Sequence, residues 1–184
     1  MDDSRTSLLV GKKRKEGQKC FNQQMFEKRG FVTDLIFFNL GMTGPIPEVI
    51  GDLVNLKVLL LANNQLTGPI PEVIGDLVNL ELLSLGNNQL TGPIPEAIGN
   101  LVYVESLSLS DNQLTGPIPV AIGNLVYLNF LFLSDNQLTG SIPETIGNQA
   151  NLHVLYLYGN ELDPAPERLT TLCESRTPKM RCLF

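Results

Sequence analysis

A unit of 24 residues recurs along most of this 184-residue chain, and its fixed spacing constrains the fold more than any other feature. Leucines and asparagines return with this period in two columns: Leu66, Leu90, Leu114, Leu138 and Leu162, and Asn64, Asn88, Asn112, Asn136 and Asn160. A unit of this length is one coil of a stacked solenoid, because it is too short to bury its own apolar side chains. We therefore expect a protein that works through an extended surface.

Each unit is expected to contain one short strand. Apolar and polar residues alternate in Leu83-Ser84-Leu85, which predicts a strand with one buried face. The strand returns every 24 residues with no room for a hairpin, so neighbouring strands should lie parallel. Six such strands, about 4.8 Å apart, form a sheet on the order of 24 Å across. The second, fourth and sixth positions of each strand then face open solvent.

The rest of each unit carries the chain to the next strand. An Asn side chain both donates and accepts hydrogen bonds, so the Asn column is expected to satisfy buried backbone groups in adjacent coils. The Thr-Gly step predicts a flexible corner, and a proline, which has no N–H, suits the start of a short helix. Five prolines are expected to open such helices: Pro47, Pro71, Pro95, Pro119 and Pro143. Each helix should carry one isoleucine into the core: Ile50, Ile74, Ile98, Ile122 and Ile146.

The repeat unit resembles that of the leucine-rich repeat family. The copy from Leu77 to Gly99 reads L-x-x-L-x-x-L-x-L-x-x-N-x-L-T-G-x-I-P-x-x-I-G, and its L-T-G-x-I-P ending is similar to the plant-type subclass. The resemblance covers roughly residues 29 to 162. It implies an α/β solenoid, a right-handed curved stack with a parallel sheet on the concave side. Short helices or 3-10 turns would lie on the convex side.

Six repeats occupy residues 31–162, and both ends are expected to be capped because an open solenoid end exposes apolar side chains. Residues 18–30 suit a helical cap that places Phe21 and Met25 on one side. Residues 1–17, which contain the run Lys12-Lys13-Arg14-Lys15, are expected to form a flexible basic tail.

Residues 163–184 are expected to form the C-terminal cap and tail. Glu167 to Cys173 predicts a short helix with Leu169 and Leu172 turned inward. The chain has three cysteines, an odd number without metal-ligand spacing, and we interpret them as reduced thiols. Cys173 and Cys182 loosely resemble the paired cysteines of extracellular C-terminal caps in this family, so a disulfide between them is the alternative.

These features favour a cytoplasmic protein. Met1-Asp2-Asp3 is acidic, and Leu8-Leu9-Val10 is too short for the apolar segment of a secretory signal. The sequence contains no Asn-x-Ser/Thr sequon, whereas secreted relatives commonly carry several. No apolar stretch reaches the roughly 18 residues that a membrane span requires. The alternative is a secreted protein, which would need an atypical export signal and a bond between Cys173 and Cys182.

The charge is distributed unevenly. The chain carries a net charge of −6, but residues 31–162 hold twelve carboxylates and one basic side chain, Lys57, for a net charge of −11. Such a surface argues against nucleic acid as a partner, because phosphate contacts need Lys and Arg. It favours another protein with a basic surface.

Comparison of the repeats separates framework positions from variable ones. Gly44 to Leu56 and Gly68 to Leu80 are identical, so the convex side is uniform, while variation concentrates on the open face of the strands. Three columns describe that face: Asp34, Val58, Leu82, Ser106, Phe130 and Val154; Ile36, Leu60, Ser84, Ser108, Phe132 and Tyr156; and Phe38, Ala62, Gly86, Ser110, Ser134 and Tyr158.

These columns place four aromatic residues at the C-terminal end of the concave sheet: Phe130, Phe132, Tyr156 and Tyr158. Aromatic side chains are common among interface hot spots, so this cluster is the predicted partner-binding site. The alternative is that the C-terminal segment folds over Tyr156 and Tyr158 and hides them.

A shallow acidic trough is predicted beside the cluster, with carboxylates around small residues: Glu81, Glu105, Asp111 and Asp135 around Ser84, Ser106, Ser108 and Ser110. The alternative, to which we give equal weight, is that these carboxylates are ordinary surface charges in contact with water.

We expect no enzymatic activity, cofactor or metal. The single histidine, His153, has no nucleophile at a recognisable spacing. Glu48, Glu72, Glu96 and Glu144 each follow a proline, where negative charge suits the start of a helix.

The predicted function is that of a monomeric protein-interaction module, which is an adaptor, scaffold or recognition protein. The alternatives are a secreted enzyme inhibitor or defence-type recognition protein, and a structural spacer or fragment of a larger receptor.

Overall fold

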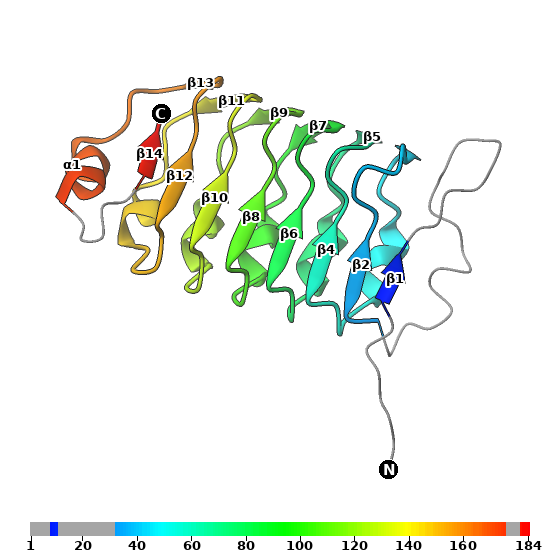
Figure 1. Cartoon of the computed structure of the whole chain (residues 1–184). Coiled ribbons are helices and arrows are strands. Elements are labelled where there is room, and N and C mark those ends of the chain that lie inside the picture. Colours follow the sequence, from blue (N-terminus) through cyan, green and yellow to red (C-terminus); the bar gives the residue numbers. More distant parts are fainter. Residues whose placement is uncertain (1–7, 11–31, 176–180) are drawn as a thin grey trace, which may run out of the picture.

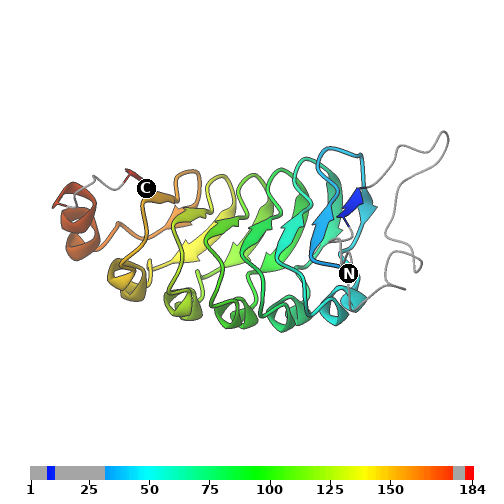
Figure 2. The ribbon, with the colours of Figure 1, turned by 60° about the horizontal axis from the view of Figure 1, so that its bottom comes forward.

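Two parallel β-sheets and a row of 3-10 helices run along the solenoid (Figure 1). The computed structural model describes residues 8–10, 32–175 and 181–184. The chain passes through the large sheet, the second sheet and a 3-10 helix in turn, and then returns to the large sheet one coil further along. In Figure 2 the 3-10 helices lie side by side along one edge of the stack. The α/β solenoid expected from the repeats is confirmed.

The large sheet has eight strands, in the order β1-β2-β4-β6-β8-β10-β12-β14. Every neighbouring pair is parallel, as predicted, and residues of adjacent repeats pair 24 apart, for example Leu59 with Leu83. The middle residue of each repeat strand is buried, and its two neighbours are half-buried or exposed. The strands are β1 Leu8–Val10, β2 Asp34–Ile36, β4 Val58–Leu60, β6 Leu82–Ser84, β8 Ser106–Ser108, β10 Phe130–Phe132, β12 Val154–Tyr156 and β14 Arg181–Leu183.

A second parallel sheet of six strands includes the Thr-Gly segment of each repeat, which the sequence predicted to be a flexible corner. In Gln65, Leu66 and Thr67 the leucine is buried and both neighbours are exposed, so the pleat turns each column leucine into the core. Gly68 bends the chain out of the strand with a φ of 77°, a conformation that glycine adopts without strain. The strands are β3 Thr43–Gly44, β5 Gln65–Gly68, β7 Gln89–Pro93, β9 Gln113–Gly116, β11 Gln137–Gly140 and β13 Glu161–Leu162.

The prolines open 3-10 helices, as expected. Pro71, for example, is extended, with φ −70° and ψ 145°, and the helix begins at the next residue. Four of the five helices begin with a glutamate, and each carries its isoleucine into the core. The helices are η3 Glu48–Asp52, η4 Glu72–Asp76, η5 Glu96–Asn100, η6 Val120–Asn124 and η7 Glu144–Asn148.

The Asn column links each coil to the previous one, which confirms its predicted structural role. The Oδ1 atom of Asn88 accepts a hydrogen bond from the Leu66 N–H at 3.0 Å, while Nδ2 donates to the carbonyls of Leu61 and Leu85 at 3.1 and 2.9 Å. The same pattern recurs at the other members of the ladder, which are Asn64, Asn112, Asn136 and Asn160.

The C-terminal cap contains the predicted helix and corrects the interpretation of the cysteines. Helix α1, Glu167–Ser175, buries Leu169 against the core. Cys173 on this helix forms a disulfide with Cys182 on β14, so the expectation that all three cysteines are reduced thiols is wrong. The bond is the one that the family resemblance offered as the alternative, and it forms because the helix and the added strand bring the two cysteines together.

At the N-terminal end, β1 pairs with β2 inside the segment that the sequence predicted to be a flexible tail. The proposed helical cap at residues 18–30 and the basic run at residues 12–15 lie outside the described residues. In the described part of the chain, no helix is both long and apolar enough to cross a membrane.

Candidate functional site

Four aromatic rings lie together on the open face of β10 and β12, which is here called the concave face. The ring centroids of Phe130 and Phe132 are 6.4 Å apart, and Phe132 meets Tyr156 edge-on at 5.3 Å. Tyr156 in turn lies 6.1 Å from Tyr158. The rings therefore form one continuous aromatic cluster, which brings together the four residues that the sequence columns had placed side by side.

The aromatic cluster is open to solvent. Phe130 and Tyr158, at its two ends, remain 41% and 40% exposed, and Phe132 and Tyr156 are half-buried between them. The described part of the C-terminal cap therefore leaves Tyr158 accessible, in contrast to the alternative that the cap hides it. In β8 the positions that pair with Phe130 and Phe132 hold Ser106 and Ser108. Since that repeat folds without rings, the fold itself does not require them.

Strand β14 adds two residues to this surface that the sequence did not predict. Arg181 pairs with Val154 and so continues the column of Phe130, while Leu183 pairs with Tyr156 and continues the column of Phe132. Both side chains are exposed. The alternation of Arg181, Cys182 and Leu183 is compatible with a strand, but three residues are too few to distinguish a strand from a tail.

A hollow of about 200 Å³ adjoins the aromatic cluster at the C-terminal end of the stack. Tyr158 belongs to both, and the remaining wall of the hollow combines the apolar residues Ile142, Leu157, Leu162, Ala165 and Phe184 with the polar residues Asn160 and Asp163. An apolar side chain of a bound segment that crosses the cluster could enter it.

The third predicted column, which runs from Phe38 to Tyr158, is only partly exposed. Ser110 and Ser134 are buried, and the hydroxyl of Ser134 donates to that of Ser110 at 2.9 Å. The residues that follow them, Asp111 and Asp135, adopt φ values of 56° and 54°, which turn the chain away from the concave face. Ser110 therefore does not belong to the trough, whereas Ser84, Ser106 and Ser108 remain half-buried on the open face.

Asp111 and Asp135 occupy a position that constrains the backbone in every repeat. The equivalent residues are Asn39, Asn63, Asn87 and Gly159, and all of them have positive φ. Asn, Asp and Gly tolerate this left-handed conformation best, so the backbone turn partly explains why aspartate stands at both positions. Both carboxylates are nevertheless exposed and available to a partner.

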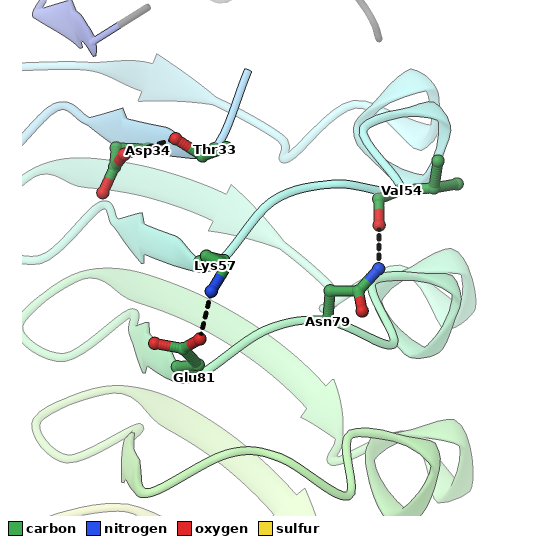
Figure 3. Close-up of polar contacts among 6 residues, drawn as sticks. All are labelled: Thr33, Asp34, Val54, Lys57, Asn79 and Glu81. Atoms are coloured by element: carbon green, nitrogen blue, oxygen red, sulfur yellow. Dashed lines mark hydrogen bonds and ion pairs between the residues drawn. The ribbon is translucent and has the colours of Figure 1, made fainter. Parts of the chain in front are cut away.

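The acidic trough is partly neutralised at its N-terminal end. Lys57 Nζ lies 2.7 Å from a carboxylate oxygen of Glu81 (Figure 3). This hydrogen bond, together with the attraction of the opposite charges, raises the pKa of Lys57 above its ordinary value. Among the described residues, no Lys or Arg forms such a pair with Glu105, Asp111 or Asp135. The uncompensated carboxylates therefore lie toward the aromatic cluster.

The histidine and the glutamates that were considered as catalytic candidates do not lie together. His153 is exposed, and its Nδ1 lies against the backbone carbonyl of Asn151. Glu48, Glu72, Glu96 and Glu144 are spread over four helices at their first positions. Within residues 8–10, 32–175 and 181–184, no three His, Cys, Asp or Glu side chains gather as a metal ion would require.

Family models match most of the repeat region. The model described as Leucine Rich repeats (2 copies) matches residues 54–98, and the model described as Leucine Rich Repeat matches residues 103–125 and 127–149. No curated protein sequence matches the chain.

Solved structures from plants share the fold. The plant peptide hormone receptor RGFR1, in complex with RGF2, is 34% identical with a TM-score of 0.75, over 78% of this chain and 23% of the receptor chain. A plant ice-binding protein is also 34% identical, with a TM-score of 0.77, over 83% of this chain and 49% of that chain. The BIR2 ectodomain from Arabidopsis thaliana is 33% identical with a TM-score of 0.64, over 72% of this chain and 69% of that chain. This chain thus spans about a quarter of the hormone receptor and half of the ice-binding protein.

Proposed function

The chain belongs to the leucine-rich repeat family, in its plant-type subclass, and we propose that it is an extracellular recognition module. It binds an extended segment of a peptide or protein along the C-terminal half of its concave face. One chain carries this whole surface, so a single copy is sufficient for binding.

The aromatic cluster is the observation that carries the proposal. Rings that are 41% and 40% exposed, at Phe130 and Tyr158, leave apolar area in water that a partner could bury. Serines occupy the equivalent positions in β8, so the rings are not needed to complete the sheet. Aromatic side chains that are held by their neighbours lose little entropy on binding, which makes them effective anchors.

The charges favour a basic partner. Glu105 and Asp111 lie in the repeat before the cluster, and Asp135 lies in the same repeat as Phe130 and Phe132. The repeat region as a whole has a net charge of −11. A segment that carries Lys or Arg next to a large apolar residue would satisfy both the carboxylates and the rings. The hollow beside Tyr158 offers space for that apolar residue or for a neighbour of it.

The proposed compartment is the oxidising exterior of the cell, in place of the cytoplasm that the sequence favoured. Two observations support it. Cys173 and Cys182 form a disulfide, and disulfides persist mainly in oxidising compartments. The similar structures include receptor ectodomains such as that of BIR2.

We further propose that the chain acts by binding and not by catalysis. The exposed His153 precedes β12, whereas the four glutamates begin four different 3-10 helices. The proposed site is an open, largely aromatic surface. Such a surface suits the recognition of an extended segment, because strands present their side chains at regular intervals.

Selection from a random peptide display library tests the proposal. We expect the full chain to enrich peptides that combine Lys or Arg with aromatic or large aliphatic residues. The double variant Phe130→Ser, Phe132→Ser gives β10 the Ser-Leu-Ser pattern of β8, so it should fold normally. It should weaken binding of a selected peptide at least about tenfold, which corresponds to about 1.4 kcal/mol. Added salt should weaken binding further by screening the carboxylates.

Phe38 provides a matched control. This ring is 52% exposed at the other end of the stack, so Phe38→Ser removes a comparable aromatic surface away from the cluster. We expect it to leave the affinity unchanged. Equal affinity for the wild type and for the Phe130→Ser, Phe132→Ser variant would refute the site. Failure to enrich any peptide would favour the alternative of a structural spacer.

A further inference from the structure

Strand β14 places a positive charge on the concave face beside the aromatic cluster. Arg181 is the first residue of β14, and its side chain is exposed. It lies at the C-terminal end of the stack, where β14 pairs with β12 (Figure 1). In the repeats themselves, none of the three columns of this face contains a Lys or Arg. Arg181 therefore gives this end of an acidic surface the opposite charge.

The fold does not account for the guanidinium of Arg181. Its backbone N–H donates to the carbonyl of His153 at 2.8 Å, a bond that any residue except proline could make. The neighbours of Arg181 on the β12 side, His153 and Val154, carry no negative charge. Among the described residues, no Asp or Glu forms an ion pair with Arg181. Its charge is thus available to a bound molecule.

Glu105 provides the opposite charge at the same edge of the sheet. It directly precedes β8, and Arg181 opens β14, so both lie at the amino ends of parallel strands. The register runs from Ser106 through Phe130 and Val154 to Arg181. Three strand spacings of about 4.8 Å therefore separate the two charged positions, a distance of about 14 Å.

The surface between these two charges is apolar. Phe130 is 41% exposed, and Val154 is half-buried in the next strand of the same column. One repeat before Glu105, the carboxylate of Glu81 is already paired with Lys57. In the described part of the chain, Glu105 has no such partner. This edge of the sheet thus presents, in order, a free carboxylate, an apolar stretch and a free guanidinium.

We propose that the bound segment carries both charges: a Lys or Arg that meets Glu105, and an Asp or Glu that meets Arg181. This inference rests on the proposed function. An extended chain advances about 3.3 Å per residue, so about four residues span the distance between the two. Side chains at positions i, i+2 and i+4 lie on the same face of such a chain. The segment therefore reads basic-x-apolar-x-acidic, or the same pattern in reverse, with its apolar residue packed on Phe130.

Arg181 selects among segments by repulsion as well as by attraction. A guanidinium matches a carboxylate with two parallel hydrogen bonds, whereas it repels a Lys or Arg at the same place. A segment that is basic throughout gains at the acidic trough but loses at Arg181. The trough offers several carboxylates along the stack, so the single opposite charge fixes where the segment stops.

Parallel selection from one peptide library by the wild type and by Arg181→Glu tests this proposal, with the C-terminus of each peptide fused to its carrier. The wild type should enrich peptides in which a basic and an acidic residue lie about four positions apart around an apolar one. Arg181→Glu should enrich a basic residue in place of the acidic one. Identical pools, or a wild-type pool without the acidic residue, would overturn this inference and leave the proposed function standing. A wild-type chain that enriches no peptide would refute both.

Affinities for one selected peptide, amidated at its C-terminus, separate a direct contact from a change in fold. Arg181→Gln should weaken binding about threefold, as the loss of an exposed ion pair does. Replacing the acidic residue of the peptide by its amide should weaken binding to the wild type equally and should not affect binding to Arg181→Gln. Arg168→Gln is the matched control, since Arg168 is an exposed arginine on α1 that donates to Asn148 of η7, and it should leave the affinity unchanged. Additive losses from Arg181→Gln and the peptide change would overturn the contact.

Discussion

Asn88 shows how much of the solenoid depends on one side chain per repeat. Its Oδ1 accepts from the Leu66 N–H of strand β5, and its Nδ2 donates to the carbonyls of Leu61 in the previous coil and Leu85 in its own. Asn88→Ala removes the side-chain acceptor of the Leu66 N–H, and a buried group left unpaired costs about 1–3 kcal/mol. The carbonyls of Leu61 and Leu85 lose one donor each but keep those of Asn64 and Asn112, so each lost hydrogen bond adds about 1 kcal/mol or less. We expect the free energy of unfolding to fall by about 3 kcal/mol. Urea denaturation followed by circular dichroism measures it.

An exposed amide gives the matched comparison. Asn79, in the exposed loop between η4 and β6, makes its hydrogen bond to the carbonyl of Val54 where water can replace it. Asn79→Ala should therefore cost about 1 kcal/mol or less. A similar loss for Asn88→Ala and Asn79→Ala would mean that the Asn column is not the stabilising element described above.

At the scale of single elements, the C-terminal cap is the part most dependent on a covalent link. The disulfide joins Cys173 on α1 to Cys182 on β14 across a separation of nine residues, and closing so short a loop contributes about 2.5 kcal/mol. Cys173→Ser, Cys182→Ser should loosen α1 and β14 while the central repeats stay protected, because a repeat contacts only its neighbours. Hydrogen exchange resolves the two regions: amides of β12 and α1 should exchange faster, and amides of β6 should not change.

Thiol titration checks the same element independently. The chain has three cysteines, so Ellman's reagent in denaturant should detect one thiol, that of Cys20, before reduction and three after it. Three thiols before reduction would contradict both the disulfide and the proposed extracellular location.

The sequence predicted those elements that a local pattern specifies. The strand at Leu82–Ser84, the asparagine at position 88 and the helix after Pro71 follow from spacing, hydrogen-bonding capacity and the missing N–H of proline. The second sheet was missed because a pattern such as Gln-Leu-Thr-Gly is as short as a turn. The burial of Ser110 was missed because it depends on the left-handed conformation of the residue that follows it.

The candidate site also has one part that the sequence predicted and one part that it missed. Parallel pairing in register is enough to bring Phe130, Phe132 and Tyr156 together, so the sequence columns predicted the aromatic cluster. Arg181 and Leu183 join it only because the disulfide and β14 return the chain to the sheet, a long-range event that no spacing indicates.

At the scale of the whole molecule, the stack should tolerate the loss of one coil. Deletion of residues 65–88 removes one unit of 24 residues and joins Asn64 to Gln89, which preserves the Asn-Gln step of every repeat. Strand β4 then lies beside β8, and helix η3 beside η5, with identical framework residues at the new contact. We expect a folded protein with a single cooperative urea transition. Its m-value should be lower by about an eighth, because less surface is exposed on unfolding.

Deletion of residues 65–92 is the control, since it is four residues longer and removes the Gln-Leu-Thr-Gly strand of the retained repeat. The new coil would lack the column leucine and a strand of the second sheet, so this variant should lose the cooperative transition. The shorter deletion leaves β10 and β12 intact, and a peptide selected on the wild type should bind it with unchanged affinity. If the two deletions proved equally unstable, stability would not be a sum over neighbouring coils. If the shorter one folded but lost the peptide, the site would extend beyond the aromatic cluster into the removed repeat.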